Sequence, residues 1–181
     1  NNNNSVIEGI TKIDCDLLCV SGGYTPAVHL FTQSGGKLLY NENKSYFYPG
    51  KNSLEQISVG SCAGIFNLKK IIDDTYIKVN EFLKTNIKND ILVSDMKSGN
   101  FENIWLIPSN KIPGKTKSFV DFQNDSTAND IKLALREGFK SIEHVKRYTT
   151  TGMATDQGKI ANMHALGIIS EHTKTKMGEL G

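Results

Sequence analysis

Two glycine-rich turns are the parts of this sequence best suited to holding a ligand. They lie in "CVSGGYTP" and "ISVGSCAG", and each follows a short apolar run that is typical of a buried strand. Ligands of open α/β sheets bind where the strands end, and glycine there lets a phosphate come close to the backbone. The same glycines could serve only to make tight turns, and spacing alone leaves that alternative open. The candidate cofactor-binding residues are Gly22, Gly23, Thr25, Pro26, Gly60 and Ser61.

Other motifs that could do chemistry are incomplete. "SNKIPGKT" resembles a phosphate-binding loop, but Ser109 stands where its first glycine is needed and a strand-like run follows it, so we interpret it as an exposed linker. Cys15 and Cys19 would share one face of a strand and are expected to pack. The histidines and cysteines lack metal-ligand spacing, so we predict no metal site, and no catalytic residue can be assigned. The histidines are His29, His144, His164 and His172.

Composition sets limits on the class of protein. The chain has 181 residues, of which 38% are hydrophobic, and a formal net charge of +2. This charge is too small to indicate nucleic acid or a membrane surface as the partner. Apolar runs are too short to span a bilayer, and the start lacks the pattern of a signal peptide. Three irregularly spaced cysteines argue against a disulfide framework, so we expect a cytoplasmic setting.

The first part of the chain, residues 1–107, has the pattern of an α/β fold. Apolar runs that end in glycine suit buried strands of a parallel sheet. Thr25 and Pro26 suit the start of a short helix, and an Asn-rich turn between two aromatic runs predicts a hairpin. The expected elements are strands at 14–20, 56–60 and 103–107, a short helix at 25–31, a hairpin of 38–40 with 46–48, and a long helix from about 63 to 84.

The last part, residues 118–181, has a helical pattern after a linker at 108–117 that is rich in proline and lysine. Thr127 and Asp130 predict a capping box, and Gly138 can end the helix that follows. Ser141 can start a second helix, and a third is expected from about 159 to 171. Two short helices followed by basic residues also imitate a helix-turn-helix DNA reader, but acidic residues interrupt the basic face.

No G-x-G-x-x-G occurs, although the glycine turns suit a dinucleotide domain. Three blocks of the sequence account for the missing motif, because together they resemble the alpha subunit of heterotetrameric sarcosine oxidase. The resemblance covers the chain from about residue 14 to its end. It implies that the chain is a fragment: the late part of a FAD/NAD-type dinucleotide-binding domain, followed by a small helical domain. The blocks are "CDLLCVSGGYTPAVHLFTQSGGK", "SVGSCAGIFNLKKI" and "SFVDFQNDSTANDIKLALREGFKSIEHVKRYTTTGMATDQGK".

The resemblance also implies a function and partners. The whole enzyme would oxidise sarcosine at a flavin, with oxygen as electron acceptor and tetrahydrofolate taking the one-carbon unit. The alpha subunit would carry NAD, the complete enzyme would also hold FAD and FMN, and the partners would be beta, gamma and delta subunits. Ser61 stands where flavin-binding relatives usually have Asp, which favours NAD at this turn. The fragment alone is expected to be inactive and to bind NAD weakly or not at all.

In related amine dehydrogenases, the small helical domain resembles bacterioferritin-associated ferredoxin and holds a two-iron, two-sulfur cluster. The resemblance places the four ligand positions at Asp121, Gln123, Asp156 and Ala161. Because such clusters need thiolate ligands, we predict that this domain binds none. The alternative within the family is the large subunit of an amine, proline or opine dehydrogenase. Cysteines at the cluster positions would have indicated that alternative.

Overall fold

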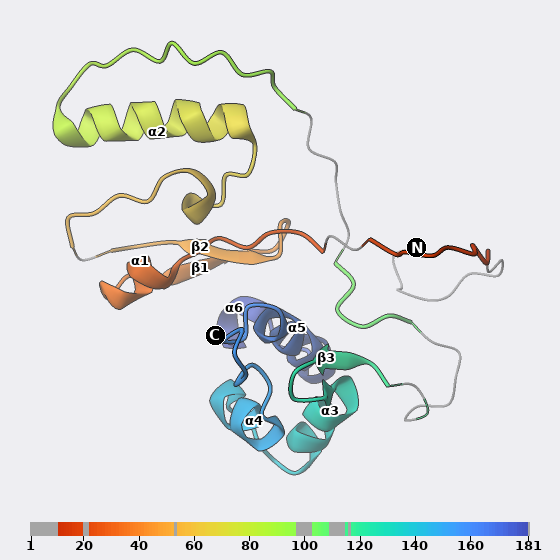
Figure 1. The fold of residues 1–181 in the computed structure, drawn as a ribbon. Helices are drawn as coiled ribbons and strands as arrows, with labels where there is room; N and C mark the ends of the chain where they lie inside the picture. The colour runs from red at the N-terminus through yellow and green to blue at the C-terminus, as the bar shows by residue number, and fades with distance from the viewer. Residues whose placement is uncertain are drawn as a thin grey trace. The chain divides into compact units, whose positions relative to one another are not determined.

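The computed structural model describes residues 11–19, 22–52, 54–96, 103–108, 115 and 117–180. The chain forms two compact units (Figure 1). One unit is Cys15–Glu102, here called the hairpin unit. The other comprises Asn1–Asp14 and Asn103–Gly181, and is here called the helical unit. Each unit has a packing of its own.

The hairpin unit contains the hairpin that the sequence predicts. Strand β1, Leu38–Asn41, pairs antiparallel with β2, Tyr46–Pro49, and Leu39 lies opposite Tyr48. The turn closes because the Ser45 backbone N–H donates to the Asn41 carbonyl at 2.7 Å, with Ser45 in the left-handed region at φ +52°. The aromatic runs on both sides of this turn therefore pair as expected.

Helix α1 is His29–Gln33, which begins later than the sequence predicts. Its N-cap is Val28, whose side chain makes no capping bond, so the expected start at Thr25 and Pro26 is wrong. Phe31 is the buried side chain of this helix. The helix therefore lies where that ring can be buried, because burial of an aromatic side chain outweighs the small energy of a cap.

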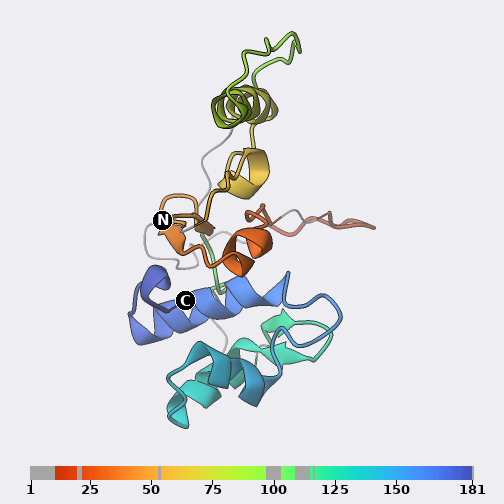
Figure 2. The same ribbon diagram turned by 90° about the vertical axis from the view of Figure 1, so that its left-hand side faces the viewer.

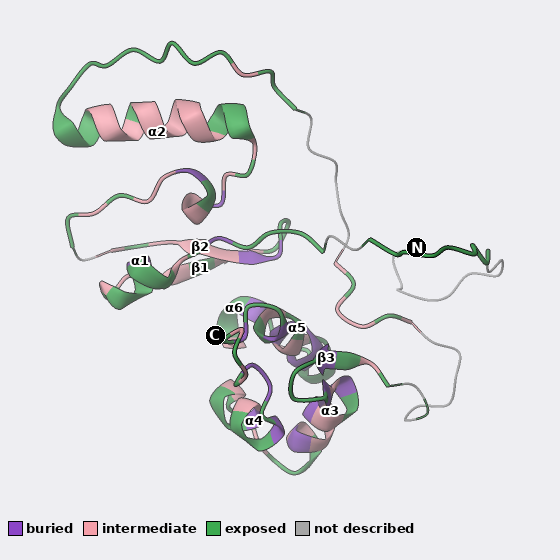
Figure 3. Cartoon of the chain, in the orientation of Figure 1, coloured by how far each residue is buried: buried purple, intermediate pink, exposed green. Residues whose placement is uncertain are grey.

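The long helix α2 is Leu68–Leu83, and a short 3₁₀ helix η1, Gly60–Ala63, precedes it. Gly64 separates the two with a left-handed φ of +83°, so α2 does not begin at about residue 63 as expected. Asn67 caps α2 by accepting the Lys70 backbone N–H at 3.0 Å. Figure 3 shows that α2 has intermediate and exposed residues but no buried one.

The expected parallel strands do not form. Among the described residues, 14–19, 57–59 and 103–107 are not strands, and β1–β2 is the only ladder of the hairpin unit. Cys15 and Cys19 are exposed rather than packed. Apolar runs become strands only where neighbouring strands take up their backbone hydrogen bonds, and these runs have no such neighbour. The hairpin unit therefore contains both helices and strands, as predicted, but its described residues form no parallel sheet.

The helical unit has the all-α character that the sequence predicts, with one small ladder added. Strand β3, Phe119–Asp121, pairs antiparallel with β4, Ser126–Thr127. Figure 2 shows α5 along one side of α3 and α4, and α3 packs against both. The helices are α3, Ala128–Arg136; α4, Ile142–Thr149; α5, Ala161–Thr173; and α6, Met177–Leu180.

One apolar core holds this unit together. Ile131 and Ala134 from α3, Val145 from α4, and Ile168 and Ile169 from α5 are its innermost side chains. Ile131 and Ala134 are three residues apart and lie on one face of α3, which is the face that the helical pattern of the sequence indicates. The four consecutive residues 166–169 of α5 are all buried, so this helix is covered on more than one side.

The predicted helix starts and ends in this unit are largely confirmed. Thr127 and Asp130 form the complete capping box of α3, and Gly138 follows α3 at φ +96°. Ser141 is the N-cap residue of α4, although its side chain makes no capping bond. A local side-chain to backbone bond fixes the start of α3, and Gly138 and Ser141 are residue types that favour helix boundaries, so the sequence reveals these positions.

Residues 103–108 belong to the helical unit rather than to the first part of the chain. Trp105 and Leu106 pack against the helical core, and the Trp105 indole lies on Gly167 of α5. His164 meets the same ring edge-on, with centroids 6.0 Å apart. Of the linker expected at 108–117, residues 109–114 and 116 lie outside the described residues. In the part of the chain that the structure describes, no helix is long and apolar enough to cross a membrane.

Candidate functional site

The first glycine turn presents an open backbone. Gly22 and Gly23 are exposed, and a Cβ placed on either would meet nothing within 4 Å. Gly23 has φ +108°, a conformation that only glycine adopts without strain. Thr25 is exposed, whereas Pro26 is buried and fixes the chain as it leaves the turn. A ligand could therefore approach this backbone closely.

The second glycine turn differs, because its glycine serves packing. Gly60 is buried at φ +62°, and a Cβ there would lie 3.1 Å from Cγ2 of Ile71. Ser61 is exposed, and its carbonyl accepts the Gly64 N–H at 3.1 Å. The Cys62 thiol donates to the Val59 carbonyl at 2.9 Å. Gly60 is thus explained by the close approach of α2, whereas Ser61 stays accessible to a ligand.

An aromatic chain connects the segments that follow the two turns. The Tyr24 ring stacks on the Phe66 ring, with centroids 5.8 Å apart. The Tyr46 ring meets the Phe66 ring edge-on, with centroids 5.6 Å apart. The buried Tyr46 hydroxyl donates to the Gly64 carbonyl at 2.6 Å. The sequence gives no sign of this contact, because rings so far apart along the chain have no periodic signature. The turns are therefore parts of one packed unit, although they do not follow strands.

The groups exposed around the two turns suit the binding of a ligand. The exposed groups are backbone amides and carbonyls with the hydroxyls of Thr25 and Ser61. Within the described residues, no group of three or more His, Cys, Asp or Glu side chains could hold a metal ion. The long helix begins at Leu68, and Asn67 caps its first turn.

The second candidate site is the pair of loops where a cluster would lie by resemblance, here called the cradle: residues 121–126 and 149–160. Asp121, at the end of β3, is buried and connects the two loops. Its Oδ1 accepts the backbone N–H groups of Gln123 at 2.9 Å and Asn124 at 3.0 Å. Its Oδ2 accepts the Gly152 N–H at 2.7 Å. One carboxylate therefore binds both loops of the cradle.

The ionisation of Asp121 follows from these partners. Burial raises the pKa of Asp121, but the hydrogen bonds from the N–H groups of Gly152, Asn124 and Gln123 together lower it by more than burial raises it. The pKa therefore lies below the usual value for an aspartate. The carboxylate is charged at neutral pH, and a charged acceptor forms the stronger hydrogen bonds.

Two more of the four resemblance positions make bonds that shape the same loops. Gln123 Oε1 accepts from the Thr155 backbone N–H at 3.0 Å and from its hydroxyl at 2.6 Å. Asp156 accepts the backbone N–H groups of Gly158 at 3.3 Å and Ile160 at 3.2 Å. Ala161 is buried at the start of α5 and offers no ligand atom. Oxygen acceptors and a methyl group thus stand where a cluster would need thiolates.

Buried hydroxyls complete the cradle. The Thr149 and Thr151 hydroxyls lie 2.8 Å apart, and the Ser126 hydroxyl donates to the Thr149 carbonyl at 2.5 Å. The Asn124 amide donates to the Thr150 carbonyl at 2.9 Å. These groups explain Thr149 and Thr151, because each of their buried hydroxyls finds a partner, whereas Thr150 is exposed. The cradle is consequently filled by its own polar groups.

Residues 115–181 match the model of the sarcosine oxidase A3 domain. Sarcosine oxidase subunit alpha of Rhizobium meliloti (strain 1021) is 38% identical over 93% of this chain, and that of Corynebacterium sp. (strain P-1) is 31% identical over 88%. The chain covers 17% of each of these relatives.

A solved structure with the same arrangement is L-proline dehydrogenase from P. horikoshii. It has a TM-score of 0.58 and 19% identity, and the match covers 88% of this chain and 34% of that one. At this identity the likeness concerns the fold alone. It does not select an activity or a substrate.

Proposed function

This chain is related to the alpha subunits of sarcosine oxidase, and on that basis we propose that it is part of the alpha subunit of a flavin-dependent oxidoreductase that demethylates sarcosine. The supporting observation is the 38% identity to a sarcosine oxidase alpha subunit along nearly the whole chain. The chain spans about a sixth of such relatives, 17% of their length, so activity, substrate and partners concern a larger assembly.

In that assembly the chain would support a dinucleotide and contact other subunits. Gly22 and Gly23 fit NAD best, because their open backbone admits a phosphate or ribose, and Thr25 and Ser61 offer hydroxyls. Gly60 fits less well, since Ile71 occupies the space beside it. Flavins, FAD and FMN in the whole enzyme, would supply the electron-accepting chemistry. No residue of this chain is assigned an acid or base role.

The helical unit would be a scaffold that has the cradle of a cluster domain without the cluster. Its support is that Asp121 and Gln123 hold the two loops through hydrogen bonds across 31 and 32 positions. A fold of this kind, similar to bacterioferritin-associated ferredoxin, needs its loops held in place by metal or by protein groups. We place it in the cytoplasm, where free thiols such as those of the exposed Cys15 and Cys19 persist.

Purification of the protein from its complete reading frame tests this proposal. The tagged protein should retain further subunits, proposed as beta, gamma and delta, and should consume oxygen when sarcosine is added. Added tetrahydrofolate should lower the release of free formaldehyde, because it would take up the one-carbon unit. Oxidation of proline or another secondary amine, with sarcosine inert, would favour the dehydrogenase alternative instead.

A further inference from the structure

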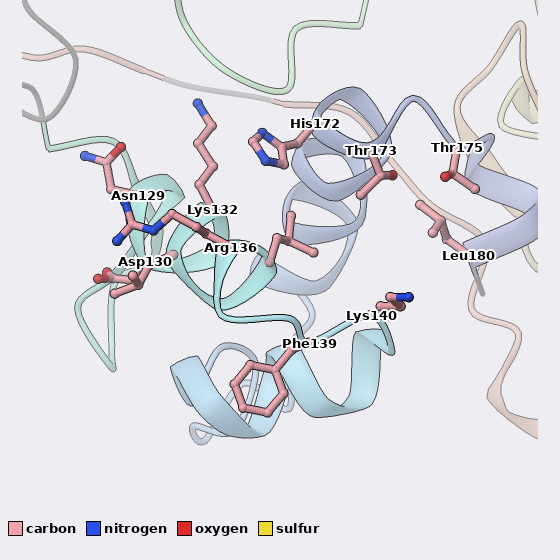
Figure 4. Close-up of a pocket in the computed structure, with 12 residues that line it drawn as sticks. Asn129, Asp130, Lys132, Arg136, Phe139, Lys140, His172, Thr173, Thr175 and Leu180 are labelled. Carbon is pink, nitrogen blue, oxygen red and sulfur yellow. The ribbon is translucent and has the colours of Figure 1, made fainter.

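An open groove lies between α3 and the corner where α5 leads into α6, and its volume is about 930 Å³. Its charged lining residues are Asp130, Lys132, Arg136 and Lys140, and His172 also lines it. Figure 4 shows Lys132 extending from α3 and His172 standing beside it at the end of α5. We call this feature the basic groove. Its lining residues include none of the glycine-turn residues and none of the cradle residues.

The cations of the basic groove are Lys132, Arg136 and Lys140, and among the described residues none of them forms an ion pair with a carboxylate. Asp130 is the one acidic lining residue, and its carboxylate is occupied in the capping box. It accepts the Thr127 backbone N–H at 2.8 Å and hydroxyl at 2.7 Å. The groove therefore has cations whose charge an anionic partner could satisfy.

The groove also has an apolar floor. Leu135, Phe139 and Leu180 line it, are half-buried and pack against the core of the helical unit. Side chains held by a core form a preorganised surface, because little further rotamer entropy is lost when they are covered. Cations beside a firm apolar floor suit a chain that carries both acidic and apolar side chains.

The spacing of the cations suits an extended chain. Lys132 and Arg136 are four residues apart on α3, which places them about 6 Å apart along the helix axis. Alternate residues of an extended chain are about 6.6 Å apart and point to the same side. Acidic residues at every second position could therefore meet Lys132 and Arg136 in turn, while the residues between them face away.

We propose that the basic groove binds an acidic segment of a partner polypeptide in an extended conformation. This proposal assigns a surface to the subunit contact proposed above. It rests on that proposed function in one respect, namely that the partner is another subunit of the same enzyme. Arg136 and His172 also lie in the last turns of their helices, where a positive charge stabilises the helix dipole. A test must therefore measure binding and not stability alone.

The test uses fluorescence anisotropy with this chain and a fluorescein-labelled peptide of about eight residues that alternates glutamate and leucine. The groove variant is the double charge reversal Lys132→Glu with Arg136→Glu. The matched control is Lys146→Glu with Arg147→Glu on α4, which changes the net charge equally but lies outside the groove lining. Circular dichroism checks that both variants keep their helices, and the neutral pair Lys132→Gln with Arg136→Gln serves if the reversal unfolds the chain.

The expected result is that the groove variant raises the Kd for the peptide by about tenfold or more, whereas the control changes it by less than about twofold. Equal losses in both variants would overturn the proposal, because they would indicate unspecific attraction. Equal binding of a lysine–leucine peptide would overturn it as well, as would displacement of the peptide by inorganic phosphate or single-stranded DNA at lower concentration. The assay contains no amine, flavin or second subunit, so its failure is distinct from failure of the proposed activity.

Discussion

The contact between Trp105 and Gly167 predicts that Gly167→Ala changes the free energy of unfolding in opposite directions with and without the Trp105 indole. Gly167 is buried in the middle of α5, and a Cβ there would lie within 2.6 Å of three carbon atoms of the Trp105 indole. Carbon atoms cannot approach so closely, so Gly167→Ala must displace the ring. Trp105 is the only tryptophan of the chain, which makes its emission a direct reporter of this displacement.

Two opposing terms decide the effect of Gly167→Ala on the free energy of unfolding. Alanine is favoured over glycine within a helix by about 1 kcal/mol. If about 100 Å² of the indole returns to water, the loss is about 2.5 kcal/mol at about 25 cal/mol per Å². We therefore expect net destabilisation of the helical unit by about 1.5 kcal/mol. The tryptophan emission should also move to longer wavelength and be quenched more strongly by acrylamide.

The double variant with Trp105→Ala tests the reasoning. Without the indole there is nothing to displace, so adding Gly167→Ala should stabilise that background by about 1 kcal/mol. Urea unfolding followed by circular dichroism measures all four proteins independently of the fluorophore. Gly22→Ala is the fluorescence control, because a Cβ at Gly22 meets nothing. If Gly167→Ala stabilises both backgrounds equally and leaves the emission unchanged, Trp105 does not lie on α5 in solution.

Four further outcomes are expected. Asp121→Asn should destabilise the helical unit by about 1–3 kcal/mol at pH 7, because the buried Gly152 N–H loses its charged acceptor. The pKa of Asp121 is lower in the folded than in the unfolded chain. Its contribution to the free energy of unfolding is therefore present above the unfolded pKa and is lost as the pH falls through the folded pKa. Acid unfolding curves of the wild type and the Asn variant should consequently converge below about pH 4. Tyr46→Phe should cost about 1–2 kcal/mol in thermal unfolding of the hairpin unit, because the Gly64 carbonyl is left unpaired, and an unchanged melting curve would contradict this. The purified chain should contain neither iron nor acid-labile sulfide. Calorimetric titration of this chain with NAD should give weak or undetectable heat, whereas the complete alpha subunit should bind NAD.

Local signals in the sequence were sufficient for much of the helical unit and for the hairpin. The capping box of Thr127 and Asp130 involves residues three positions apart, and the turn before Tyr46 closes within five. Such contacts form wherever the local chain allows them, so residue types and spacing reveal them. The apolar face of α3 is likewise indicated by helical periodicity, because the same side of that helix faces the core.

Only the tertiary structure decided the features that depend on distant partners. The runs at 14–19 and 57–59 are apolar enough for strands, yet they form none in the described chain, because a strand is defined by its neighbour and not by its own residues. The link from Asp121 to Gly152 spans 31 positions, and the packing of Trp105 on Gly167 joins segments still further apart. Neither has a periodic signature. The sequence could therefore indicate which thiolates are missing from the cradle, but only the folded chain shows the carboxylate and hydroxyls that hold its loops together.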